Sequence, residues 1–140
     1  MSIRGDNWTG FARQMDQVLG DFIWVRFAYA VHQHIEDYTV PQYGDHGEDL
    51  ATNYTKKDCM NAVAKYKARR GRNAREGQAE LDEMKIVHYL QMAVERGHPF
   101  EYVIEDCKEA RFRWGSITMD KQNDVEFPKA AVNWISGTST

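Results

Sequence analysis

Apolar side chains recur at helical spacing along much of the chain, and this pattern predicts a mainly α-helical protein. Thr9 can cap a first helix, which is interrupted at Gly20. The apolar face of this helix holds Phe11, Met15, Val18 and Leu19. A second helix is predicted over residues 22–37, and its first half is apolar nearly all round, so we expect it to be the most buried element. Residues 38–54 are rich in acidic side chains and contain a proline and two glycines, which predicts a loop.

Residues 55–97 predict a helical hairpin. Thr55 and Asp58 form a helix-start signature, in which each side chain accepts a free N–H of the first turn. Gly71 is placed to end the first helix in a left-handed conformation. The two predicted helices span residues 56–70 and 78–96. Because the connection between them is short, the helices should pack antiparallel.

The C-terminal third has a less regular pattern. Residues 99–110 predict a further helix, whereas residues 111–119 alternate enough to predict a short strand or an extended arm. Residues 127–135 predict one or two more helical turns, and residues 136–140 a frayed tail. We therefore expect a single domain over residues 1–140: a helical bundle around an antiparallel αα-hairpin, with a small irregular or β-containing C-terminal segment.

Composition and charge limit the possible functions. The formal net charge is −3 and the pI is about 5.9, which argues against sequence-specific DNA binding because that usually needs a broad basic face. The longest strongly apolar stretch, residues 22–31, contains Arg26 and is too short to span a bilayer. Two cysteines and no apolar signal core predict reduced thiols and a cytoplasmic location, in the host if a phage encodes the chain. The histidines lack metal-site spacing, so no metal centre is predicted.

Positive charge is concentrated near the tip of the predicted hairpin. Residues 65–75, KYKARRGRNAR, hold six of the 18 Lys and Arg residues. Attraction to a helix C-terminus, at ~0.3–1 kcal/mol per cation, explains one or two of them better than six. Arginine offers paired donors that match phosphate oxygens, and a nearby aromatic ring can stack on a base. The candidate ligand-binding residues are Lys65, Tyr66, Arg69, Arg70, Arg72, Arg75 and Lys85. The alternative is solvated charge, or ion pairs with the acidic residues at 44–49.

Two spaced motifs in the hairpin resemble a family of small phage proteins. The first motif reads Lys65-Tyr66-x-x-Arg69-x-Gly71-Arg72, and the second reads Asp82-x-x-Lys85-x-x-x-Tyr89-Leu90. The family carries KYxxRxGKK followed by DLxKAxxYL, and its best-known branch comprises nucleotide kinases that lack a P-loop. The chain departs from the pattern at Asn73, Glu83 and Ile86, where the family usually has Lys, Leu and Ala.

The resemblance implies a geometry for the hairpin. It brings Lys65, Arg69 and Lys85 together with Asp82, which is then a structural partner of Lys65 or Arg69 rather than a catalytic group. Tyr66 and Tyr89 would be core residues. Part of the basic run therefore builds the hairpin, and the case for a ligand is stronger for the residues left over, which are Arg70, Arg72 and Arg75.

Carboxylates on the second hairpin helix leave an enzymatic alternative open. Glu80 and Glu83 form an ExxE pair on one helix face. Two such pairs can hold Mg²⁺ for pyrophosphate cleavage, but a second pair is hard to find in the sequence. Mg²⁺ is therefore expected only if the protein is an enzyme, and the sequence identifies no catalytic residue. Structural or metal-assisting roles are assigned to Asp82, Glu80, Glu83 and Tyr89.

These features favour a phage-type protein that recognises a nucleotide, a cyclic nucleotide or another nucleotide-derived signal, and that sequesters it against host defence. The first alternative is an enzyme of nucleotide metabolism, resembling a nucleoside monophosphate kinase or an NTP pyrophosphohydrolase. The second alternative is an interaction module that inhibits a host protein. Large aromatic side chains in the C-terminal third predict a homo-oligomer: Phe112, Trp114, Phe127 and Trp134.

Overall fold

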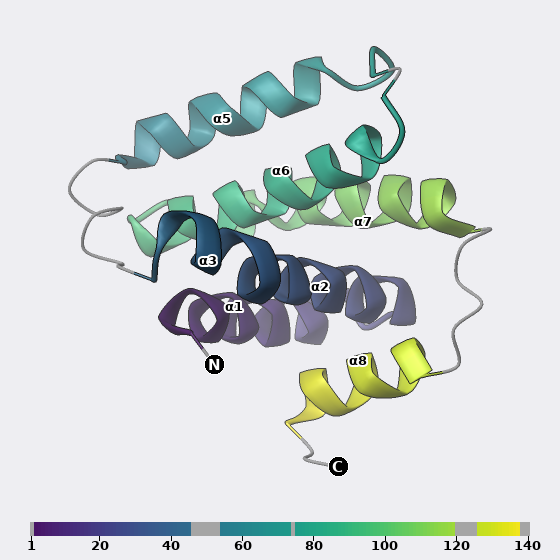
Figure 1. Cartoon of the computed structure of the whole chain (residues 1–140). Helices are drawn as coiled ribbons and strands as arrows, with labels where there is room; N and C mark the ends of the chain where they lie inside the picture. Colours follow the sequence, from purple (N-terminus) through teal and green to yellow (C-terminus); the bar gives the residue numbers. More distant parts are fainter. Residues whose placement is uncertain (1, 46–53, 74, 120–125, 138–140) are drawn as a thin grey trace. The chain divides into compact units, whose positions relative to one another are not determined.

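The computed structural model describes residues 2–45, 54–73, 75–119 and 126–137, and their regular structure is helical throughout. In chain order the elements are α1 (Ile3–Leu19), α2 (Phe22–His34), a π-helix (Ile35–Thr39), α3 (Val40–Tyr43), α5 (Lys56–Ala68), α6 (Gln78–Glu95), a 3₁₀ turn (Phe100–Tyr102), α7 (Ile104–Thr118) and α8 (Glu126–Ser136) (Figure 1). The prediction of a mainly α-helical protein is confirmed. No helix among these residues is both long and apolar enough to cross a membrane.

Contacts divide the chain into two compact units. The first unit contains residues 1–46 and 119–140, and the second contains residues 47–118. Helices α1, α2, α3 and α8 belong to the first unit, whereas α5, α6 and α7 belong to the second. A single domain over residues 1–140 stays a prediction.

Tryptophan indoles join α1 to α2 in the first unit. Trp8 and Trp24 are fully buried and pack near each other, with ring centroids 6.1 Å apart. The Trp8 Nε1–H donates to the Ala28 carbonyl at 2.9 Å, and the Trp24 Nε1–H donates to the Ala12 carbonyl at 3.0 Å. Buried indole N–H groups need such partners, because an unpaired donor costs about 1–3 kcal/mol. The two helices are therefore held together by ring packing and by two hydrogen bonds, one donated from α1 to α2 and one from α2 to α1.

The first helix begins earlier than predicted. Ser2, not Thr9, is the N-cap, and its hydroxyl accepts from the Gly5 N–H at 2.8 Å. The Thr9 hydroxyl lies inside the helix and donates to the Gly5 carbonyl. The first turn carries mostly polar side chains, so apolar periodicity did not reveal it. Tertiary bonds hold it instead, since the Ser2 hydroxyl and amide donate to the Glu36 carboxylate.

Helical structure also extends past the predicted end of the second helix. The π-helix at Ile35–Thr39 and α3 continue it to Tyr43, so the loop prediction was wrong for residues 38–43. Pro41 lies in the first turn of α3, directly after the π-helix, and its missing N–H removes one backbone donor from this continuous helical segment. Residues 46–53 of the predicted loop lie outside the described residues.

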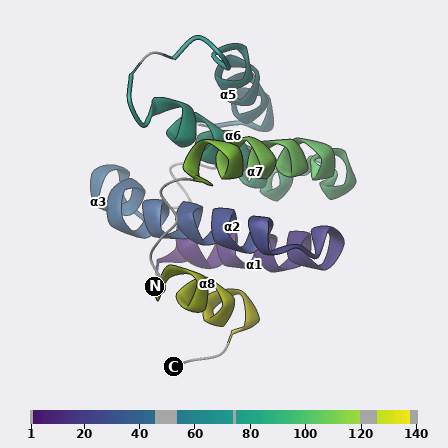
Figure 2. The ribbon, with the colours of Figure 1, turned by 90° about the vertical axis from the view of Figure 1, so that its right-hand side faces the viewer.

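Helix α8 packs on α1 and α2 (Figure 2). Arg13 donates from Nη2 to the Trp134 carbonyl at 2.9 Å and from Nε to the Ile135 carbonyl at 3.1 Å. These donors satisfy carbonyls at a helix C-terminus, which have no partner within the helix itself. The Trp134 ring stacks on His32, with centroids 5.0 Å apart, and its indole N–H donates to the Thr9 hydroxyl. The predicted helical turns at 127–135 therefore form part of a docked helix.

The second unit confirms the predicted hairpin. The Thr55 hydroxyl accepts from the Asp58 N–H, and the Asp58 carboxylate accepts from the Thr55 N–H, which completes the capping box of α5. Gly71 follows α5 with φ of 78°, in the left-handed region that glycine adopts without strain. Helix α6 then packs along α5 (Figure 1).

Helix α7 occupies the segment that was expected to be a strand. It runs to Thr118, so the prediction of a strand or extended arm at 111–119 was wrong. Its buried residues are Cys107, Ala110, Arg111, Trp114 and Thr118. This spacing of three and four residues is helical. The alternation of apolar and polar side chains over residues 111–119 does not show which of them are buried, and this is decided by the packing of α7 on α6.

Gly5 leaves room for the Glu36 carboxylate beside α1. A Cβ at Gly5 would lie 1.8 Å from the Glu36 Oε1, whereas a Cβ at Gly10 in the same helix would meet nothing within 4 Å. We expect Gly5→Ala to displace Glu36 from Ser2 and to lower the free energy of unfolding by about 1–3 kcal/mol. Gly10→Ala is the matched control and should raise it by up to about 1 kcal/mol. Urea unfolding measures both, and equal effects of the two variants would contradict this role of Gly5.

Protonation of His32 should weaken the first unit. His32 is buried against Trp134, and its Nδ1 has no hydrogen-bond partner in the described part of the chain. Burial lowers the pKa of His32, although Glu36 and other carboxylates oppose the shift. The histidine in the unfolded chain therefore binds a proton more readily than His32 in the folded protein. The free energy of unfolding should be highest above about pH 6.5 and should fall as the pH drops below this value.

Thermal unfolding between pH 7.5 and 5 tests this expectation. His32→Gln should flatten the pH dependence, whereas His34→Gln, at a half-buried position, should retain it. An unchanged slope in His32→Gln would assign the pH dependence to other groups.

Candidate functional site

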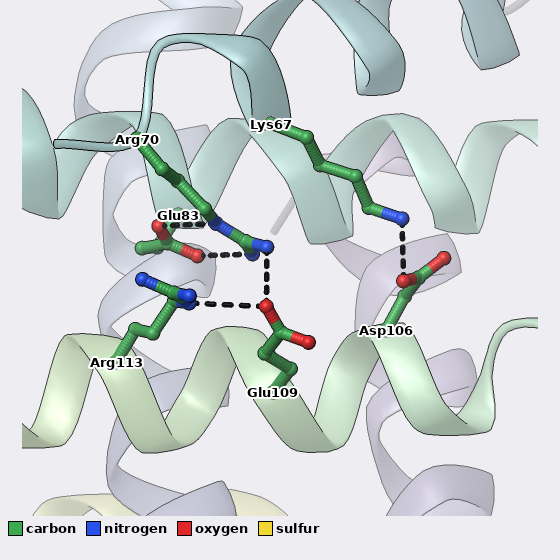
Figure 3. Close-up of polar contacts among 6 residues, drawn as sticks. All are labelled: Lys67, Arg70, Glu83, Asp106, Glu109 and Arg113. Carbon is green, nitrogen blue, oxygen red and sulfur yellow. Dashed lines mark hydrogen bonds and ion pairs between the residues drawn. The ribbon is translucent and has the colours of Figure 1, made fainter. Parts of the chain in front are cut away.

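Part of the basic run forms an ion-pair network that joins three helices (Figure 3). The Arg70 guanidinium, just beyond α5, donates to both oxygens of Glu83 on α6, at 2.7 and 3.0 Å. It also donates to Glu109 on α7 at 2.6 Å, and Arg113 donates to the same carboxylate. Lys67 pairs separately with Asp106 at 2.5 Å.

The Arg70 guanidinium is therefore paired with carboxylates of the protein itself. The Glu83 side chain is only 4% exposed, so its charge needs a partner inside the protein. Burial by itself lowers the pKa of Arg70, but the hydrogen bonds and charge of Glu83, together with Glu109, outweigh this and raise it. The ligand-binding role of Arg70 stays a prediction, and its donors face the carboxylates of Glu83 and Glu109.

Asp82 lies beside Glu83 and is also buried, at 2% exposure. It accepts a hydrogen bond from Gln78 at 2.8 Å and another from the Asn73 side-chain amide. The Arg69 Nε lies 3.4 Å from its carboxylate. Asp82 is thus the structural partner of Arg69, one of the two pairings that the resemblance implied.

Three cations surround the ring of Tyr66. The Lys65 Nζ, the Arg69 Cζ and the Lys85 Nζ lie 5.3, 5.4 and 5.2 Å from its centroid. These distances allow cation–π attraction, which contributes about 0.5–1 kcal/mol at exposed sites. Lys65 and Arg69 come from α5 and its C-cap, whereas Lys85 comes from α6.

Tyr66 also belongs to a column of three tyrosines. Its ring stacks on Tyr89 at 6.0 Å, and Tyr89 stacks on Tyr54 at 5.7 Å. Burial, then a hydrogen bond with Tyr54, raises the pKa of Tyr89, so its hydroxyl stays protonated at neutral pH. The cations therefore lie at one end of a column of stacked aromatic rings.

A cleft of about 430 Å³ opens along this column. It is lined by Tyr54, Asp58, Asn61, Ala62, Lys65, Tyr66 and Tyr89. This volume lies within the usual range for small-molecule sites, which is about 300–1,000 Å³. Its walls combine aromatic side chains with a few polar groups, as is typical of such sites.

Electrostatics at the basic end of the cleft favour an anion. Neither Lys65 nor Lys85 has a carboxylate partner within the described ranges, although both ammonium groups lie near the same ring. Arg69 adds a third positive charge near this ring, and Asp82 lies 3.4 Å from its Nε as a counter-charge. Like charges held together repel, so an anion bound between them would be stabilised.

Of the predicted ligand-binding residues, only Lys65 and Tyr66 line the cleft, and Arg69 and Lys85 lie beside it at the Tyr66 ring. Arg72 and Arg75 are exposed in the connection between α5 and α6, where their ligand-binding role stays a prediction. Glu80 is half-buried on α6, but its ExxE partner Glu83 is held by Arg70. No group of three or more His, Cys, Asp or Glu side chains with metal-site geometry occurs among the residues that the structure describes.

Sequence reasoning missed Tyr54 and Asn61 as lining residues and used Asp58 only as a helix cap. A signal was available for two of them, because Asp58, Asn61 and Lys65 recur at i, i+3 and i+7 along one face of α5. Tyr54 precedes the helix, and only the tertiary structure brings it to Tyr89.

Comparison with known protein families, with curated protein sequences and with solved structures gave no match to this chain. The resemblance of the hairpin motifs to the phage family stays a prediction.

The two neighbouring arginines should behave differently when they are removed. Arg70→Ala leaves the buried Glu83 without its partner, so we expect the free energy of unfolding to fall by about 3–5 kcal/mol. Arg72→Ala changes an exposed side chain and should shift the free energy of unfolding by no more than about 0.5 kcal/mol. Chemical denaturation compares the two, and a stable Arg70→Ala protein would refute the structural role.

Proposed function

We propose that the cleft between α5 and α6 binds a nucleotide or a nucleotide-derived signal. The observation that carries this proposal is the position of Lys65, Arg69 and Lys85 around Tyr66, at one end of a tyrosine-lined cleft. A nucleotide has the matching combination of a planar base and a charged phosphate.

The two lysines and Arg69 would hold the phosphate. Ammonium and guanidinium groups form charge-assisted hydrogen bonds with phosphate oxygens, which are about twice as strong as neutral ones. Lys65 and Lys85 come from different helices, so a phosphate between them would also tie α5 to α6. Binding should therefore stabilise the second unit.

The tyrosines would hold the base. Tyr54 is half-buried, stacks on Tyr89 and lines the cleft, where its ring would contact a base. Stacking of a base on an aromatic side chain contributes about 1–3 kcal/mol. It is tolerant of base identity, so further contacts are needed for selectivity.

Binding without turnover is the form of this function that we favour: the protein would sequester a nucleotide signal used in host defence, as expected for a phage-type protein. A nucleoside monophosphate kinase is the second candidate, and the spaced Lys65 and Lys85 motifs that resemble the phage family support it. Incubation with ATP, Mg²⁺ and nucleoside monophosphates distinguishes the two, because only a kinase forms nucleoside diphosphates.

Lys65→Met and Lys85→Met test the phosphate site. Each should weaken nucleotide binding at least about tenfold, because each removes one charge-assisted contact. The free protein should lose no more than about 1 kcal/mol, the upper value for one exposed cation–π contact. Lys108→Met, at an exposed position on α7, is the matched control and should bind as the parent protein does.

Thermal shift with mono-, di-, tri- and cyclic nucleotides gives the readout, because a ligand of the folded state raises the melting temperature. Isothermal titration then gives the dissociation constants of the variants. The absence of a shift with every nucleotide would refute the proposal. Equal weakening by Lys108→Met would show that only net charge matters.

A further inference from the structure

The cleft has opposite chemical character at its two ends. Lys65 lies at the basic end, beside the Tyr66 ring. Asn61 and Asp58 line the same cleft from earlier turns of α5. A helix rises 1.5 Å per residue, so Asn61 and Asp58 lie about 6 and 10.5 Å from Lys65 along the helix axis. The bound molecule should therefore be anionic at one end and rich in hydrogen-bond donors at the other.

Asp58 keeps acceptor capacity beyond its role in the helix cap. Its Oδ2 accepts from the Thr55 N–H at 2.9 Å and from the Thr55 hydroxyl at 3.0 Å. These bonds lower the pKa of Asp58, so the group is a carboxylate at neutral pH. A carboxylate has about four lone-pair positions, and two are used here. The remaining ones can accept from a ligand.

Asn61 supplies the complementary pattern. Its side chain is exposed on α5, and its amide has no hydrogen-bond partner within the described part of the chain. A carboxamide offers an N–H donor and a carbonyl acceptor side by side. Asp58 and Asn61 together present several acceptor oxygens to the cleft, and the Asn61 amide supplies a donor next to its own carbonyl acceptor.

We propose that Asp58 and Asn61 read the edge of the base, and that the cleft selects nucleotides whose base carries an exocyclic amino group. This inference rests on the proposed nucleotide-binding function. Adenine and cytosine place an amino donor beside a ring nitrogen acceptor, which matches the carboxamide of Asn61. Guanine has two adjacent donors, which match the carboxylate of Asp58. Uracil and thymine carry a carbonyl oxygen where adenine and cytosine carry the amino group, so the Asp58 carboxylate would face an acceptor.

The same charge also fixes the direction of binding. A phosphate near Asp58 would be repelled, whereas a phosphate near Lys65 and Lys85 would be attracted. The nucleotide should therefore bind with its phosphate at the Tyr66 end and its base edge at the Asp58 end. Asp58 is a specificity-determining residue in this arrangement, not a catalytic one.

Titration of AMP, CMP, GMP and UMP into the full chain tests the inference. We expect the three amino-bearing nucleotides to bind at least about tenfold more tightly than UMP, as one charged hydrogen bond predicts. In Asp58→Asn, the asparagine carbonyl can still accept from the Thr55 N–H, so the helix cap is kept. This variant should bind AMP, CMP and GMP more weakly, so that their preference over UMP falls to within about threefold. Lys65→Met is the matched control, because it should weaken all four nucleotides equally and leave the preference unchanged.

Other outcomes separate this inference from the proposed function. Equal affinity for UMP and AMP would overturn base-edge reading while nucleotide binding stands. A preference for AMP over dAMP that disappears in Asp58→Asn would show that Asp58 reads a ribose hydroxyl instead, and would also overturn it. Failure of every nucleotide to bind would overturn both, and inorganic phosphate then shows whether the cations retain any anion site.

Discussion

The buried carboxylate of Glu83 is the constraint on which the hairpin geometry depends. A charge with 4% exposure is tolerated only with a close partner, and Arg70 supplies one with two hydrogen bonds. Because Arg70 comes just after α5, this pair fixes the end of α5 against α6. Glu109 binds the same guanidinium, so α7 is held at the same point. The polar network thus determines how three helices meet.

The same pairing divides the basic run into two functional parts. Lys67 and Arg70 face carboxylates on α6 or α7, and Lys65 shares the Tyr66 ring with Lys85. Arg69 lies near both Asp82 and the Tyr66 ring. Tyr66, on the last turn of α5, stacks on Tyr89 of α6. Of the three arginines that sequence reasoning favoured for a ligand, Arg70 faces carboxylates, whereas Arg72 and Arg75 are exposed. The position of the cations around Tyr66 beside a cleft, rather than their number, supports the proposed function.

The first unit shows a different use of polar groups. Its core is aromatic, and the indole N–H groups of Trp8 and Trp24 are satisfied by backbone carbonyls of the facing helices. Arg13 completes the C-terminal end of α8 in the same way. These bonds connect residues far apart in the sequence and have no local sequence pattern. They explain why the start of α1 and the docking of α8 were not predicted in detail.

The sequence by itself determined the helical class and the ends of the hairpin helices, because capping groups, left-handed glycines and apolar periodicity are local properties. The resemblance of two of its motifs to the phage family also implied that Lys65, Arg69, Lys85 and Asp82 lie together. The sequence did not decide which cations are neutralised, because an arginine and a carboxylate 13 residues apart pair only after two helices have packed. The cleft and its Tyr54 wall depend on the same packing. Tertiary structure alone therefore distinguished the cations that build the fold from those available to a ligand.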